Sequence, residues 1–189
     1  MKRLWIGLAA LLLTAVPALA STVIGMSVED QARLSRHVVL GTIVSQVGID
    51  DSINGIETEV TIKVRRDFKS VAKAGDVLTF HTRSGQVGEE VSIAVGEAVF
   101  HSGRPVLVFL EDIDGTLYNL GLSSGVFDVH EGRRGEVAFT RALQDGLEVY
   151  GDAFEMGPIP IQAMARRVAA AMQKPEFDNP ILREARVEN

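Results

Sequence analysis

The segment 56–65 has the sequence IETEVTIKVR, and it shows the clearest pattern in the chain. Every second residue from Ile56 is apolar or, at position 58, threonine, and the residues between them are charged or, at position 61, threonine. A period of two is typical of a β-strand with one face in the core and the other in water. The outward positions are then Glu57, Glu59, Thr61, Lys63 and Arg65, and the inward ones are Ile56, Thr58, Val60, Ile62 and Val64.

Strand-like segments lie on both sides of this one. They are residues 37–45, 77–82, 91–95, 105–110, 116–122 and 126–129. The run PVLVFL at 105–110 is apolar throughout, which predicts a central strand covered on both faces. Turn signals at Asn54-Gly55 and Asp114-Gly115 separate the segments. No helix of ten or more residues is predicted between them, which excludes a βαβ sheet and favours a mainly β, antiparallel barrel or sandwich.

Helices are predicted only at the edges of this region. Ser27 can cap a short helix that runs to about Arg36, with acidic residues in its first turn. Residues 161–173, IQAMARRVAAAMQ, form an amphipathic pattern that Pro175 ends, with Ile161, Met164, Ala165, Val168 and Met172 on one side. Residues 131–175 are therefore expected to append a hairpin, with a strand over 137–143, and a C-terminal helix, and residues 176–189 a flexible tail.

The first twenty residues have the organisation of a secretory signal peptide. Lys2 and Arg3 precede an apolar run from Leu4 to Val16, and Ala18 and Ala20 form an A-x-A cleavage pattern. An uncleaved anchor is the alternative, but the run is shorter than the roughly 20 residues that span a bilayer. We expect export to a periplasm or out of the cell, a mature chain that begins at Ser21, and a barrel domain over 21–130.

Composition excludes several functional classes. The 189 residues include no cysteine, so disulfides, thiolate metal sites and cysteine nucleophiles are absent. Loss of Lys2 and Arg3 leaves 17 basic residues against 25 acidic ones and changes the net charge from −6 to −8. Because phosphate backbones and anionic lipids are bound mainly through Lys and Arg, we expect neither a nucleic-acid partner nor stable membrane insertion after signal cleavage.

The order of segments is similar to that of a known family. After the N-terminal helix come 37–44 (HVVLGTIV), 58–64 (TEVTIKV), Asp67-Phe68-Lys69, 76–80 (DVLTF) and 103–110 (GRPVLVFL). This pattern, over about 27–129, resembles the netrin-like barrel of the tissue inhibitors of metalloproteinases and of uncharacterised exported bacterial proteins. The resemblance implies an OB-like β-barrel. Those inhibitors chelate zinc through a disulfide-linked N-terminal cysteine, so their mechanism does not carry over to a chain that starts at Ser21.

One motif suggests catalysis. Gly121-Leu122-Ser123-Ser124-Gly125 matches G-x-S-x-G, in which the serine lies on a sharp turn from a strand into a helix. The residues that follow, VFDV, favour a strand, and Asp128 and His130 are too close in sequence for the usual triad. A serine hydrolase that uses Ser123 is therefore kept as the alternative to a simple turn. Residues 70–73 match S-x-x-K but lack the companion S-D-N and K-T-G motifs.

Metal sites have weak signals. The turns Asp50–Gly55 and Asp112–Gly115 carry carboxylates before a glycine, as calcium loops do, but hairpin turns explain both and Thr61 occupies the position of the expected glutamate. The four histidines, His37, His81, His101 and His130, lack zinc-ligand spacing. We therefore predict no metal and no cofactor, with calcium at the two turns left open.

A basic run along the exposed strand face is the remaining binding candidate. The run consists of Lys63, Arg65, Arg66, Lys69 and Lys73, and the candidate binding residues are Lys63, Arg65, Arg66, Lys69, His81 and Arg83. A solvated face without function is the alternative. Taken together, these features favour an exported, non-catalytic interaction module that recognises another exported protein, with protease inhibition as one form. A structural envelope component is a further alternative, and the sequence leaves the oligomeric state open.

Overall fold

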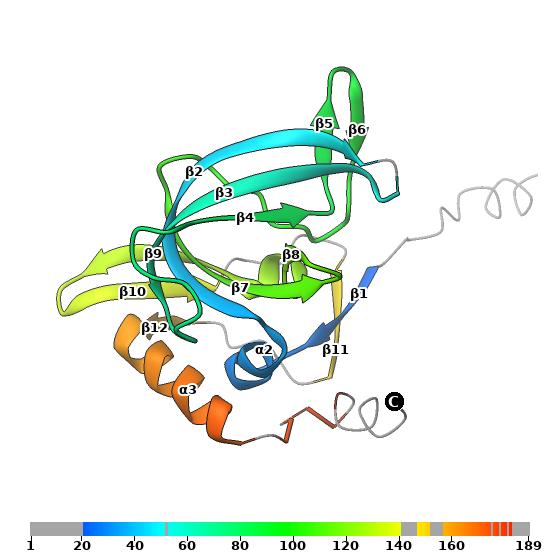
Figure 1. Cartoon of the computed structure of the whole chain (residues 1–189). Coiled ribbons are helices and arrows are strands. Elements are labelled where there is room, and N and C mark those ends of the chain that lie inside the picture. The colour runs from blue at the N-terminus through cyan, green and yellow to red at the C-terminus, as the bar shows by residue number, and fades with distance from the viewer. Residues whose placement is uncertain are drawn as a thin grey trace, which may run out of the picture.

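The computed structural model describes residues 21–51, 53–140, 147–151, 157–174, 176, 177, 179, 180 and 182 (Figure 1). The predicted signal peptide, the turn at Asp145-Gly146 and most of the predicted tail lie outside these residues. The helices are α2 (Val28–Leu34), α3 (Ile161–Gln173) and the 3₁₀ turn η1 (Leu122–Gly125). The strands are β1 (Ser21–Gly25), β2 (His37–Asp51), β3 (Gly55–Asp67), β4 (Val77–Thr82), β5 (Gly85–Val87), β6 (Glu90–Ser92), β7 (Pro105–Ile113), β8 (Thr116–Asn119), β9 (Val126–Gly132), β10 (Gly135–Thr140), β11 (Leu147–Gly151) and β12 (Pro158–Pro160).

Five of these strands close a barrel in the order β2-β3-β4-β8-β7, and β7 pairs again with β2. The mainly β class and the barrel are confirmed. The prediction of a wholly antiparallel sheet is wrong, because β4 and β8 run parallel where His81 lies beside Tyr118. A closed ring with an odd number of strands cannot alternate direction throughout, so at least one neighbouring pair must be parallel.

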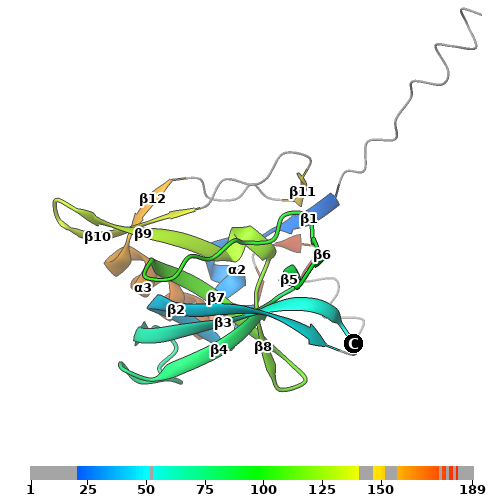
Figure 2. The same cartoon turned by 90° about the horizontal axis from the view of Figure 1, so that it is seen from above.

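A second layer extends from β7. One half of the β7 edge pairs with β8 and the other half with β9, which continues the sheet through β10 to β12. Figure 2 shows this extension leaving the barrel on one side, and α2 and α3 lie beneath β2 and β7 in Figure 1. The strand predicted over 137–143 is β10, which ends at Thr140 among the described residues. β1 pairs with β11 in a separate parallel ribbon.

Two apolar clusters share β2 and β7. Val106, Val108 and Leu110 point into the barrel interior, whereas Leu107 and Phe109 pack under the helices. The predicted burial of PVLVFL on both faces is therefore confirmed. Residues of β2 alternate in the same way, with Val38 and Leu40 in the helix-side cluster and Val39 and Ile43 in the interior.

The helices match their predictions closely. The Ser27 side chain accepts a hydrogen bond from the Asp30 amide at 3.1 Å, so it caps α2, although that helix ends at Leu34 rather than Arg36. α3 has the predicted bounds and buries Ile161, Met164, Val168 and Ala171. Met172, predicted on the same side, is instead exposed, since the buried stripe follows steps of three and four residues and reaches Ala171 in the last turn. Among the described residues no helix is long and apolar enough to cross a membrane.

The β5–β6 hairpin stands at one end of the barrel, at the top of Figure 1. Its attachment depends on two glycines. A Cβ added to Gly48 of β2 would lie 1.8 Å from the Gln86 carbonyl oxygen, and one added to Gly85 would lie 2.2 Å from the Glu57 carbonyl oxygen. The main chain of β5 therefore rests directly on the main chains of β2 and β3. The strand predicted over 91–95 is shorter here and ends at Ser92.

Candidate binding site

The structure divides the six predicted binding residues into two groups. Lys63, Arg65, Arg66 and Lys69 lie on or just after β3, toward one end of the barrel, whereas His81 and Arg83 lie beside Tyr118. Arg65 forms an ion pair with Glu136 of β10 at 2.7 Å. The Arg66 guanidinium lies 4.6 Å from the centre of the Phe68 ring. Only part of the predicted basic run is therefore available to a partner as unpaired charge.

Lys69 has a structural role. Its ammonium group donates to the carbonyl oxygen of Ala32 at 2.9 Å and to that of Ser35, the residues at the end of α2. The last carbonyls of a helix have no main-chain partners within it, and a cation near them also interacts favourably with the helix dipole. The Ser35 hydroxyl donates to the Ala32 carbonyl oxygen as well, at 3.3 Å. Burial lowers the pKa of Lys69, while the Asp67 charge opposes that change. The side chain holds the end of α2 to the loop that follows β3.

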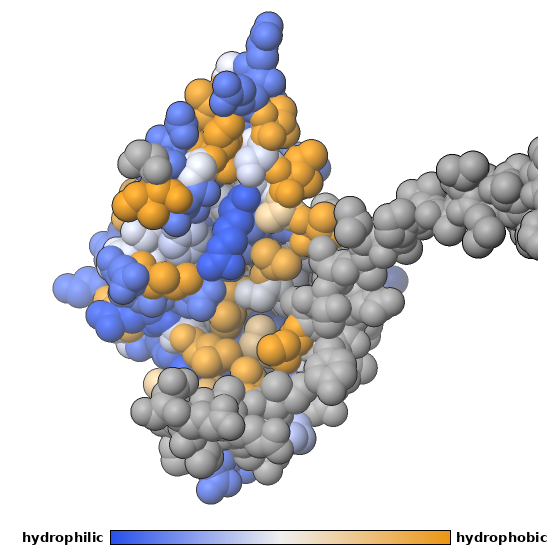
Figure 3. Space-filling model, turned by 90° about the vertical axis from the view of Figure 1, so that its right-hand side faces the viewer, coloured by the Kyte–Doolittle hydropathy of each residue, from blue (hydrophilic) through white to orange (hydrophobic). Residues whose placement is uncertain are grey.

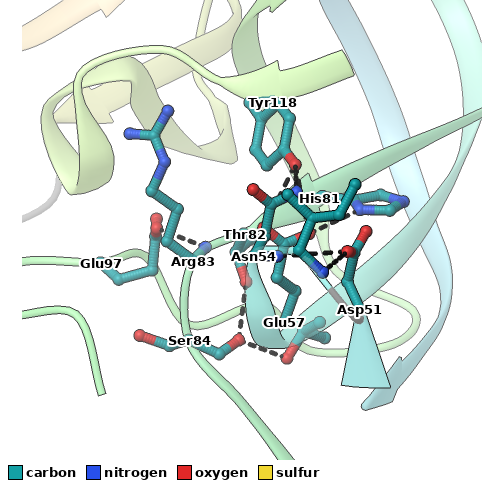
Figure 4. Close-up of polar contacts among 11 residues, drawn as sticks. Asp51, Asn54, Glu57, His81, Thr82, Arg83, Ser84, Glu97 and Tyr118 are labelled. Atoms are coloured by element: carbon teal, nitrogen blue, oxygen red, sulfur yellow. Dashed lines mark hydrogen bonds and ion pairs between the residues drawn. The ribbon is translucent and has the colours of Figure 1, made fainter. Parts of the chain in front are cut away.

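His81 belongs to a buried polar cluster on the outer face of the barrel (Figure 4). The Glu57 carboxyl group, whose residue is only 3% exposed, accepts hydrogen bonds from the Tyr118 hydroxyl at 3.1 and 3.3 Å. His81 Nδ1 lies 2.8 Å from Glu57 Oε2. In the main-chain register Glu59 of β3 lies opposite His81 of β4, and His81 lies opposite Tyr118 of β8. Glu57 is two residues before Glu59, so the side chains of Glu57, His81 and Tyr118 are on the same face of the sheet. Burial and the Glu57 carboxylate raise the pKa of Tyr118.

This cluster corrects one sequence prediction. The alternation correctly places Glu57 on the outer face of β3, but the expectation that it meets water is wrong. Tyr118 and His81 reach it from the neighbouring strands, and Asn54 adds a contact to the Tyr118 hydroxyl at 3.5 Å. The local pattern of one strand cannot reveal which side chains of two other strands will cover it.

Arg83 joins the cluster to the loop that follows β6. Its guanidinium lies 5.3 Å from the centre of the Tyr118 ring, and its main-chain amide donates to the Glu97 carboxylate at 2.9 Å. Glu97 is buried and also accepts from the Asn119 side chain at 2.8 Å and from the Ala98 amide at 3.0 Å. Glu97 thereby fixes the loop against both β4 and β8.

A hollow of about 390 Å³ lies beside this cluster, between the β2–β3 turn and the β7–β8 turn. The turn carboxylates that suggested calcium bind their own main chain. Asp51 accepts from the amides of Ile53 and Asn54, at 2.7 and 3.2 Å, and these bonds lower its pKa. Asp112 accepts from the Gly115 amide at 2.9 Å. Within the described part of the chain, no group of three or more His, Asp or Glu side chains is arranged to hold a metal.

A second hollow, of about 490 Å³, opens where the β5–β6 hairpin leaves the barrel. Buried Ala98 and Phe100 lie at this hollow, and Val91, Ile93 and Val99 surround it with exposed apolar surface. Ile93 is 78% exposed. Figure 3 views the molecule from the right-hand side of Figure 1 and shows several patches of apolar residues, in orange, in its upper part.

Hydrogen bonds hold the loop at Ser84, which lines this second hollow. Thr58 and Thr82 donate to the Ser84 carbonyl oxygen at 2.7 and 3.1 Å, and the Ser84 hydroxyl accepts from the Ala94 amide at 2.8 Å. These bonds satisfy the polar groups of the loop while leaving the apolar side chains on either side of it in water. A large exposed apolar surface beside a preformed hollow is typical of an interaction site.

Ser123 lies in a different place. It lines a third hollow of about 580 Å³, together with Asp128 and His130. The serine is 4% exposed and its hydroxyl has no hydrogen-bond partner in the described structure. Gly121 and Leu122 have left-handed φ angles of 68° and 56°, but η1 is one short 3₁₀ turn that leads into β9 rather than a helix that follows a strand. The strand predicted after the motif is confirmed.

Comparison with known protein families, with characterised proteins and with solved structures finds no match to this chain. The arrangement of side chains is therefore the basis for a functional conclusion. Sequence reasoning named His81 and Arg83 of this cluster, but it named neither Glu57 nor Tyr118 as a candidate and did not predict the hollow below the hairpin. The sequence signal for that hollow is the group of apolar residues within 91–99, which follows a glycine-rich loop.

Proposed function

We propose that this chain is an exported, non-catalytic module that binds another exported protein at the hairpin end of an OB-type barrel. The barrel order, β2-β3-β4-β8-β7, with its single parallel pair, supports the OB type, in which the first strand pairs with the second and the fourth. Proteins of this type often bind ligands across the face and turns at one end of the barrel. The two turns and the hairpin described above lie at that end.

The apolar hollow below the hairpin is the observation that carries the proposal. Val91, Ile93 and Val99 expose apolar surface around a depression with Phe100 at its base. A partner that inserts an apolar side chain would remove this surface from water, and a few such anchors supply most of the binding energy in protein interfaces. Inhibition of a protease would be one form of such binding.

Charge supports a protein partner over nucleic acid or an anionic surface. The chain from Ser21 has a net charge of −8, and Glu89 and Glu90 are exposed at the hairpin tip. Among its described residues, the hollow is lined by no Lys, Arg or His. A segment with an apolar anchor and neighbouring basic residues would match both features.

Affinity capture from an exported fraction tests the proposal. The bait is the chain 21–189, and Ile93→Ser is compared with Val77→Ser, which changes a similarly exposed β-branched residue on β4. We expect one or more proteins to be captured by the wild type and by Val77→Ser and lost with Ile93→Ser. Equal capture by both variants, or no reproducible capture, would contradict the proposal.

The hydrolase that uses Ser123 is the second candidate. The unpartnered Ser123 hydroxyl, beside Asp128 and His130 in one hollow, is the observation that favours it. A serine-reactive probe should then label the wild type and the Ser124→Ala variant but not Ser123→Ala. Absence of labelling in the wild type would remove this candidate.

A further inference from the structure

The third hollow combines a buried hydroxyl with an exposed arginine and an exposed histidine. It lies between β9 and the loop that leads from β6 to β7, and its volume is about 580 Å³. Ser123 lies deep in this region, and its amide is fixed to the Gly96 carbonyl oxygen at 2.9 Å. The main chain around Ser123 is therefore held in place, while its side-chain hydroxyl lacks a partner. A buried polar group without a hydrogen bond costs free energy, so such a group often has a ligand or a water as its partner.

A tight turn brings His101 and Arg104 to the same hollow. The Arg104 amide donates to the His101 carbonyl oxygen at 3.2 Å, and Gly103 has a φ of 78°. The first and last residues of a β-turn lie within about 7 Å of each other. His101 and Arg104 both line the hollow and both are exposed. Within the described part of the chain, neither side chain has a hydrogen bond or an ion pair.

The opposite wall limits the charge of a ligand. Asp128, His130 and Glu131 of β9 line it, and the His130 ring contacts the Phe139 ring with 5.4 Å between their centres. Glu97 lines the hollow as well, and its carboxylate accepts hydrogen bonds from the Arg83 and Ala98 amides and the Asn119 side chain. These three carboxylates oppose a dianion such as phosphate, whereas a ligand with a single carboxylate can still pair with the guanidinium of Arg104. Ala98, Val99 and Pro105 supply apolar contacts for the rest of a ligand.

We propose that this hollow is a binding site for a carboxylate group, held by Arg104 and His101 and by a hydrogen bond from the Ser123 hydroxyl. The carboxylate belongs either to the C-terminus of a peptide or to a free organic acid. The hollow shares Glu97, Ala98 and Val99 with the apolar hollow below the hairpin. Arg104, His101 and Ser123 line only the former and Ile93 only the latter, so loss of carboxylate binding in their variants is distinguishable from loss of partner capture with Ile93→Ser.

An NMR titration of the ¹⁵N-labelled chain 21–189 tests this site. The probes are tri-alanine with a free C-terminus, the same peptide as its C-terminal amide, acetate and inorganic phosphate. We expect the free peptide to shift the amide signals of residues 101–104 and 123, and the amidated peptide and phosphate to leave them unchanged. Shifts with acetate at the same concentrations would identify a free acid as sufficient, and shifts with the peptide alone would identify a peptide C-terminus.

Three variants separate a binding role from a packing role. Arg104→Gln should weaken binding of the peptide about tenfold or more, which corresponds to about 1.4 kcal/mol. Ser123→Ala should weaken binding while keeping the fold, and Arg134→Gln, an exposed arginine of the β9–β10 turn, should leave the Kd unchanged. The proposal is overturned if no carboxylate shifts these signals, if the amide binds equally well, or if Arg104→Gln and Ser123→Ala bind like the wild type.

Discussion

Single side chains decide whether a polar group on the outer face of the barrel is exposed to solvent or buried. Glu57 lies at an outward position, yet Tyr118 and His81 cover its carboxyl group and bond to it. Tyr118→Phe would remove the hydroxyl donor and keep the ring. We expect a loss of about 1.5–3 kcal/mol in the free energy of unfolding, measured by urea denaturation, because a hydrogen bond to a carboxylate in a buried site is lost.

Thr79→Val is the matched control for that change. Thr79 is exposed on β4, and none of the side-chain hydrogen bonds described involves it. Exchange of its hydroxyl for a methyl group should change the free energy of unfolding by less than about 0.5 kcal/mol. A Tyr118→Phe protein as stable as this control would show that water replaces the tyrosine hydroxyl at Glu57.

At the scale of elements, the hairpin depends on close main-chain contact with the barrel. Gly48→Ala would place a Cβ 1.8 Å from the Gln86 carbonyl oxygen, so β5 must lift away from β2. We expect a loss of about 1–3 kcal/mol in stability, as for other overpacked sites, and faster hydrogen exchange over residues 84–92. Gly157→Ala, where a Cβ would meet no atom within 4 Å, is the control and should change neither quantity.

The sequence predicted elements better than contacts between them. The inward positions Val60, Ile62 and Val64 of β3, the continuous apolar run of β7 and the amphipathic pattern of α3 each follow from the local sequence, and each is confirmed. The hairpin and the Glu57 cluster depend on which strands meet and at what register. Local pattern does not encode that information. A polar residue such as Glu57 therefore looks solvent-exposed in the sequence although it is buried by residues far along the chain.

At the scale of the whole molecule, β2 and β7 contribute residues to both apolar clusters, the barrel interior and the cluster under the helices. The predicted closed sheet is correct, but the sequence could not show that a second layer of strands and two helices would cover one side of it. Both faces of these strands lose their water only when the barrel interior and the helix layer are formed together. This arrangement favours one cooperative folding unit over two independent ones.

Met164 provides a test of that cooperativity. It is fully buried between α3 and the sheet, and Met164→Ala should cost about 2–5 kcal/mol of unfolding free energy because the helix cannot collapse fully into the cavity. Met172→Ala, on an exposed position of the same helix, should cost less than about 0.5 kcal/mol. Hydrogen exchange followed by mass spectrometry can then compare α3 with β3, whose buried residues Val60 and Ile62 lie only in the barrel interior. If the two cores fold as one unit, protection of the slowest amides in α3 and in β3 falls by the same amount, since both exchange through global unfolding. A loss of protection confined to α3, with β3 unchanged, would instead show that the barrel is stable without its helix layer.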